Sequence, residues 1–250
     1  PSGRVSIGMS STNAALFAVD LYRIVQEKYP EIQIYITDAG SASRYEWLTD
    51  RRLDFAMLFS LPDEGELDAV PLYHDEFCLV TRADRAESGD AVEFSSIFSR
   101  PLVISSQTTA WRKILDDVAE RSGHRIASVI ETETINVIMA IVMAGEASSI
   151  LPLSYVRSEV ERGGLVAQRL INPELRVTIS LASVGGMEMT PAKLAVRDVI
   201  IDIARNSNKL NGHLNTRTNV VPALRAFPTP IVQNALTSSR HLLHQLWDSI

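Results

Sequence analysis

The alternation of strand and helix patterns over the first 59 residues restricts the fold more than any other feature of this sequence. Apolar and polar residues alternate at the start, as in a strand with one buried face, and a helical spacing then runs until Pro30 ends it. A second strand, a short helix and an almost continuous apolar run follow. Because strands joined by helices pair in parallel with right-handed crossovers, this order predicts a parallel sheet. The predicted segments are residues 5–8, 14–29, 32–37, 44–52 and 53–59.

A second unit repeats this pattern after residues 81–94, where apolar periodicity disappears. A strand at 102–104 leads into a hydroxyl-rich turn and a helix at 111–121 that Gly123 closes. The 250 residues suffice for two lobes of about 100 to 150 residues each. We therefore predict an α/β fold of two Rossmann-like lobes, the first from residues 1–80 and 182–206, the second from 81–181. Further strands are predicted at 70–72, 76–80, 126–130, 148–151, 165–170 and 177–184, and further helices at 135–144, 152–162 and from Thr190.

Polar turns follow several of the predicted strands. Ser10, Ser11, Thr12 and Asn13 precede the first helix, where unpaired backbone N–H groups and the helix dipole favour an anion. One of the four is needed as an ordinary N-cap, so only the surplus is available to a ligand. Both interpretations stay open at this point.

Composition and missing motifs exclude several classes of function. A net charge of −6 without a long basic block argues against DNA binding by this segment itself. No nucleotide-binding, zinc-protease or serine-hydrolase fingerprint occurs, and no nucleophile and base pair stands out, so we expect no enzyme and no cofactor. The single cysteine, Cys78, lies in an apolar run and predicts a reduced, cytoplasmic setting; no apolar stretch is long enough for a membrane span.

Three weaker candidates have ordinary structural explanations. His241 and His244 have helical spacing, but solvated histidines explain them better than a metal site, and we predict none. Glu131 and Glu133 are expected on a solvated rim. Trp111 is expected in the core rather than over a ligand.

In order and spacing, several segments resemble the effector-binding region of LysR-type transcriptional regulators. They are GRVSIG (3–8), EKYP (27–30), LDFAM (53–57), PLYHDE (71–76), FCLV (77–80), IVMAGEASSILP (141–152) and Gly164-Leu165, followed by the helix at Thr190. The resemblance covers about residues 3–206. One departure is Glu146-Ala147-Ser148, where the family usually has a second glycine.

The resemblance implies a type 2 periplasmic-binding-protein-like fold with a ligand cleft between the lobes. It implies that a small, anionic metabolite is sensed there, that the protein forms homodimers or homotetramers, and that DNA is bound through a winged helix-turn-helix domain upstream of Pro1. Carried over by position, the residues lining the cleft are Ser10, Ser11, Thr12, Ser41, Ser105, Ser106, Thr132 and Thr134. These positions coincide with predicted strand ends, where open parallel sheets bind ligands. A solute-binding protein of a transport system is the alternative with the same fold.

Residues 207–250 are interpreted as a linker and a C-terminal extension. Asn, Lys, Gly, His and Thr dominate the linker, and apolar residues recur at helical spacing between Ile231 and Ile250. A docking helix is favoured, and a loosely ordered extension is the alternative.

Overall fold

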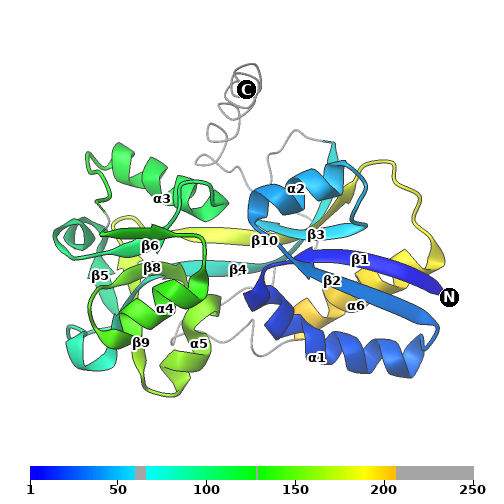
Figure 1. The fold of residues 1–250 in the computed structure, drawn as a ribbon, viewed down its shortest axis with the longest axis horizontal. Coiled ribbons are helices and arrows are strands. Elements are labelled where there is room, and N and C mark those ends of the chain that lie inside the picture. Colours follow the sequence, from blue (N-terminus) through cyan, green and yellow to red (C-terminus); the bar gives the residue numbers. More distant parts are fainter. Residues whose placement is uncertain (60–65, 128, 207–250) are drawn as a thin grey trace.

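A computed structural model of the chain describes residues 1–59, 66–127 and 129–206. Figure 1 shows two groups of elements, with β4 and β10 running between them across the middle of the molecule. The predicted α/β class with two lobes is confirmed. The strands are β1 (Gly3–Met9), β2 (Ile32–Asp38), β3 (Phe55–Phe59), β4 (Leu67–Arg82), β5 (Ala91–Glu93), β6 (Val103–Ser105), β7 (Ile130–Thr132), β8 (Ser149–Pro152), β9 (Leu165–Ile171) and β10 (Arg176–Val184). The helices are α1 (Ser11–Lys28), α2 (Ser41–Thr49), α3 (Ala110–Arg121), α4 (Ile135–Ala144), α5 (Leu153–Glu161) and α6 (Pro191–Asn206), with short 3-10 turns at Ala83–Arg85 and Phe94–Ser99.

The first lobe is built on the strand order β2-β1-β3-β10-β4. β1 pairs in parallel with both β2 and β3, as the alternation of strands and helices predicts. β10 joins antiparallel to β3 and β4, so the sheet is mixed where a parallel sheet was predicted. The late strand enters from the second lobe rather than through a helical crossover, which explains its opposite direction.

β4 is one continuous strand, and the prediction of two separate strands at 70–72 and 76–80 is wrong. The polar residues His74 and Asp75 interrupt the apolar pattern, which hides the continuity of the strand in the sequence. The strand exchanges partners near Glu76, because residues up to there pair with β10 and residues from Phe77 onward pair with β8 and β9. The exact lobe limits at 80/81 and 181/182 stay a prediction, since both β4 and β10 belong to the connection.

One apolar core extends through both lobes. α1 buries Phe17, Leu21 and Val25 against the first sheet, as its helical spacing predicts. In the second lobe Trp111 is only 6% exposed and its ring lies 6.0 Å from that of Phe77, which confirms the core interpretation of this tryptophan. The shared core joins the lobes and fixes the crossing strand between them.

α4 leaves part of its apolar surface uncovered. Its buried residues are Ile138 and Val142, whereas Val137 and Met143 are 41% and 47% exposed. Gly145 ends the helix in the left-handed region (φ 77°), and a Cβ there would lie 2.5 Å from the guanidinium carbon of Arg82. The backbone angle favours glycine at this position, whereas the Arg82 guanidinium is the end of a flexible, partly exposed side chain.

None of the described helices has both the length and the apolar character needed to cross a membrane. The docking helix predicted for Ile231 to Ile250, with His241 and His244, lies outside the described residues.

Candidate functional site

The start of α1 contacts the second lobe through Ser10. Its Oγ accepts a hydrogen bond from the backbone N–H of Asn13 at 3.2 Å, which confirms that one of the four polar residues is the N-cap. The side chain of Tyr155 on α5 lies close to that of Ser10. Burial raises the pKa of Tyr155, and the nearby Ser10 opposes that rise. Ser10 is therefore committed to capping and to an interlobe contact, whereas Ser11 next to it is exposed.

Asn13 ties the same turn to the crossing strand. It is 3% exposed, and its Oδ1 accepts a hydrogen bond of 2.7 Å from the Tyr73 hydroxyl on β4. Because both groups are buried, losing either leaves the other without a partner. The turn that begins α1 is thus held in place relative to β4.

α2 begins beside α1 because the strands before them end together. Met9 at the end of β1 is paired with Asp38 at the end of β2. Gly40 occupies the N-cap position of α2 without a side-chain cap, and Ser41 is the first helical residue. Ser10, Ser11, Thr12 and Ser41 therefore follow two adjacent strand ends, as predicted.

The predicted residues of the second lobe also come together. β6 pairs in parallel with β7, which places Ser105 opposite Thr132. The backbone N–H of Ser106 donates to the Thr132 carbonyl at 3.2 Å, and the N–H of Thr134 donates to Thr132 Oγ1 at 3.1 Å. Thr134 holds the N-cap position of α4 as predicted, but its side chain makes no capping hydrogen bond.

The side chain of Ser105 faces inward. It is 1% exposed, and its Oγ accepts a hydrogen bond from Thr109 Oγ1 at 2.9 Å. Its carbonyl oxygen accepts a 2.7 Å bond from the buried Arg112, which also pairs with Asp116 at 2.9 Å and Glu131 at 3.0 Å. Ser105 therefore supports the turn, while Ser106, only partly buried, lies nearer to solvent.

The two glutamates of the predicted solvated rim are exposed but not free. Glu131 forms the ion pair with Arg112, and Glu133 accepts a hydrogen bond from the Thr108 hydroxyl. The predicted solvated rim is confirmed, because both glutamates are exposed, and their partners come from the turn before α3 and from α3 itself. The hydroxyl of Ser106 lies 2.9 Å from that of Thr108 and extends this cluster.

Asp75 lies at the junction of the lobes and was not predicted. It is 5% exposed; one carboxylate oxygen accepts from Ser154 Oγ at 2.6 Å, and the other accepts from the N–H groups of Ser154 at 3.3 Å and Glu76 at 3.0 Å. Burial raises the pKa of Asp75 to about 6, although these hydrogen bonds and Arg157 oppose the rise. An acidic residue within an apolar strand pattern was the only signal in the sequence.

Arg44 is a second buried charge that was not predicted. It is 2% exposed, its Nε donates to the Met57 carbonyl at 3.2 Å, and Nη1 donates to the Ala39 carbonyl. Desolvation lowers the pKa of Arg44, against the opposing influence of Tyr155 and Asp38. Its position in the predicted helix 44–52 gives no hint of burial, because Gly8 of β1 and Met57 of β3, which lie beside it, belong to other segments of the sequence.

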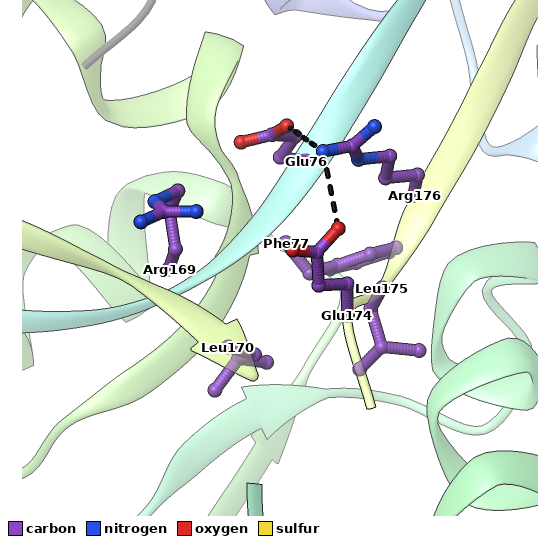
Figure 2. Close-up of a pocket in the computed structure, with 7 residues that line it drawn as sticks. All are labelled: Glu76, Phe77, Arg169, Leu170, Glu174, Leu175 and Arg176. Atoms are coloured by element: carbon purple, nitrogen blue, oxygen red, sulfur yellow. Dashed lines mark ion pairs between the residues drawn. The ribbon is translucent and has the colours of Figure 1, made fainter. Parts of the chain in front are cut away.

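Two concave regions differ greatly in size. Figure 2 shows a small pocket beside the connection of β9 to β10, where Arg176 pairs with Glu76 at 3.0 Å and Glu174 at 3.1 Å. Its volume of about 10 Å³ leaves room for little more than a water molecule. A groove of about 580 Å³ runs between α1 and β2, lined largely by apolar residues including Leu21, Tyr22 and Ile34.

Among the 1–59, 66–127 and 129–206 ranges, no cluster of three or more His, Cys, Asp or Glu residues could hold a metal ion. Helix starts, hydroxyls and buried polar groups thus gather near the junction of the lobes. Open α/β sheets commonly bind ligands at such strand ends. Whether the eight predicted residues share one ligand stays a prediction.

The chain belongs to the family described as LysR substrate binding domain, whose sequence model matches residues 1–205. The nitrogen assimilation regulatory protein nac of Escherichia coli K12 is 25% identical over 203 residues, covering 81% of this chain and 66% of that protein. The HTH-type transcriptional regulator BbuR of Bordetella bronchiseptica is 24% identical over 181 residues, covering 72% of this chain and 56% of BbuR. The chain thus spans about two thirds or less of these relatives.

Solved structures agree with this assignment of the fold. The regulatory domain of CcmR from Synechocystis PCC6803, in complex with 2-PG, has a TM-score of 0.74 at 16% identity and covers 82% of this chain and 99% of its own. The effector binding domain of QuiR in complex with shikimate has a TM-score of 0.73 at 17% identity. The match covers 82% of this chain and 98% of the QuiR chain. The predicted family and fold are both confirmed.

Proposed function

We propose that this chain is the effector-binding part of a LysR-type transcriptional regulator and senses a small anionic metabolite between its lobes. The family match over residues 1–205 carries the proposal, and it favours a regulator over a transport-system binding protein. DNA binding is assigned to a winged helix-turn-helix domain outside this chain, and the setting to the cytoplasm. The chain itself binds without turnover, in keeping with relatives that are named as regulators.

Two observations support an anionic effector. The starts of α1 and α2 follow adjacent strand ends, so two sets of unpaired N–H groups lie in the same region. The similar structures of CcmR and QuiR were solved in complex with 2-PG and shikimate. A signal then requires that the ligand binds one arrangement of the lobes more tightly than another.

A thermal-shift screen against small organic acids, amino acids and neutral sugars tests this function. One class of acid should raise the melting temperature saturably, because a ligand that binds only the folded chain stabilises it. The double variant Ser11→Ala with Thr134→Ala alters one exposed hydroxyl on each lobe. It should lose most of the ligand-induced shift while its own melting temperature stays within a few degrees of wild type.

The matched control changes two exposed serines outside the predicted site, Ser95→Ala with Ser158→Ala. This control should keep the full ligand-induced rise in melting temperature. An equal rise in both double variants would rule out the predicted site. Stabilisation by neutral sugars alone would rule out an anionic effector.

The homodimer or homotetramer is proposed from two uncovered apolar faces. On α1, Val19 and Tyr22 are 52% and 68% exposed beside the groove over β2. On the second lobe, Ile130 of β7 and Val137 of α4 are 44% and 41% exposed. In a dimer with twofold symmetry, the α1 face of each copy packs against the second-lobe face of its partner. Both apolar faces of both copies are then covered.

Sedimentation equilibrium of charge variants tests this assembly. Tyr22→Glu and Val137→Glu should each shift the chain to monomer, because a charge would be buried in the contact. Leu194→Glu on α6 is the control, because this leucine is exposed but belongs to neither of the two apolar faces. Dimers that persist in both test variants, or that dissociate equally in the control, would contradict the proposed contact.

A further inference from the structure

The guanidinium of Arg44 has one nitrogen that no described residue engages. Nε and Nη1 donate to the carbonyl oxygens of Met57 and Ala39, while Nη2 has no hydrogen-bond acceptor among residues 1–59, 66–127 and 129–206. The residue is nonetheless 2% exposed. Nη2 is not one of the described buried atoms that lack a partner, so this nitrogen reaches solvent while the rest of the Arg44 side chain is buried.

The charge of Arg44 also lacks a neutralising partner. In the described part of the chain no carboxylate lies within ion-pair distance of it, although Asp38 is near enough to favour the charged form. Tyr155 is near as well, but burial raises the pKa of that phenol, so it stays neutral at physiological pH. Arg112, the other fully buried arginine, shows the usual solution, with Asp116 and Glu131 at 2.9 and 3.0 Å. A buried charge without such a partner is costly.

The surroundings place Arg44 at the interlobe side of the first sheet. Its aliphatic stem crosses the end of β1 over Gly8, where a Cβ would lie 3.2 and 3.3 Å from its Cγ and Cδ. Tyr155, which favours the charged form of Arg44, belongs to α5 of the second lobe and lies close to Ser10 at the start of α1. The unpaired cation thus lies between two helix starts and the opposite lobe.

We propose that Arg44 is the anion anchor of the effector site, with Nη2 donating to a carboxylate, phosphate or sulfate oxygen of the ligand. This inference rests on the proposed function and narrows it, because it assigns the acidic group of the effector to the first lobe. The anion supplies the missing counter-charge of Arg44, and the dipoles of α1 and α2 add to its stabilisation. The hydroxyls of the second lobe then face the other end of the ligand.

Titration calorimetry of the full chain with phosphate, sulfate and acetate, each up to about 50 mM, tests this anchor without knowledge of the effector. At least one of these anions should bind saturably to the wild type. Arg44→Met keeps most of the stem but removes the charge, and it should weaken that binding by about tenfold or more. Arg44→Lys keeps the charge, and its affinity for the anion should lie between those of wild type and Arg44→Met.

Arg52→Met is the matched control, because Arg52 is exposed in the same lobe, with its guanidinium 5.0 Å from the Trp47 ring centre. It removes the same charge and should leave the affinity unchanged. If Arg44→Met fails to fold, a spectrum of the ¹⁵N-labelled arginine side chains of the wild type gives the answer. Phosphate or sulfate should then shift the Arg44 signals and leave those of Arg52 in place.

No saturable anion binding to the wild type, or equal binding by Arg44→Met and Arg52→Met, would overturn the proposal. The proposed function is tested separately. An organic acid from the screen that binds Arg44→Met as tightly as wild type would leave the sensor intact and remove Arg44 as its anchor. Anion binding at Arg44 with no stabilising metabolite would support the anchor and count against the sensor.

Discussion

Replacing Asp75 by Asn should change how the stability of the chain depends on pH. The Asp75 carboxyl has a pKa of about 6 in the folded chain, against an ordinary value of 3.8, mainly because it is buried. Between these two values the folded chain holds a proton that the unfolded chain has released. The free energy of unfolding therefore falls as the pH rises through this window.

The size of the effect follows from the difference between the two pKa values. About two pKa units at about 1.36 kcal/mol each give a loss of about 3 kcal/mol between pH 4 and pH 7. Asn resembles the protonated acid, because its Oδ1 can accept from the N–H groups of Ser154 and Glu76 while its amide donates to Ser154 Oγ. The variant should match wild type within about 1 kcal/mol near pH 4 and exceed it by about 3 kcal/mol at pH 7.5.

Urea unfolding followed by circular dichroism, at half-unit steps from pH 4 to pH 8, measures this difference. Asp68→Asn, an exposed carboxylate on the same strand, is the control and should follow the wild-type curve within about 0.5 kcal/mol. A stability difference between Asp75→Asn and wild type that is constant across this range would refute the reasoning. The buried carboxyl would then ionise as easily as an exposed one.

Three further changes test the packing around the site. Tyr73→Phe should cost about 1 to 3 kcal/mol of unfolding free energy in urea titrations, because it leaves Asn13 Oδ1 buried without its donor; an unchanged midpoint would contradict that bond. Gly8→Val should lower the melting temperature by several degrees in calorimetry, because a Cβ at this position would lie 2.7 Å from Leu53 Cδ1. An unchanged melting temperature would contradict this and show that the neighbouring side chains can move. Cys78 should react with a thiol reagent only on unfolding, because burial raises its pKa well above the ordinary value; fast labelling of the native chain would contradict this.

Regular periodicity explains why so much of the fold could be predicted from the sequence. The buried face of α1 and the fully buried β3 follow from local apolar spacing, and Pro30 and Gly145 mark helix ends by their backbone chemistry. The continuity of β4 and the antiparallel entry of β10 could not be read in this way. Both depend on strand pairs more than 90 residues apart, such as Asp75 with Val177.

The hydroxyls of the candidate site could be predicted from the sequence, but its buried charges could not. Hydroxyls at strand ends are visible in the sequence, and the structure does gather Ser105, Ser106 and Thr132 at one turn. Arg44 and Asp75 were missed because a charged residue in a sequence predicts exposure, and only the packing of distant segments buries them. These buried charges are where the local rules fail, and both lie in or beside the junction of the lobes.

Hydrogen–deuterium exchange, with and without the acid that stabilises the chain most, tests the central claim directly. If one ligand is held between the lobes, exchange should slow both at the start of α1 around Ser11 and at the turn around Ser106. Backbone amides elsewhere on the far edges of both sheets should be unaffected. Slowed exchange in only one of these two turns, or only along the groove between α1 and β2, would contradict a site built from both lobes.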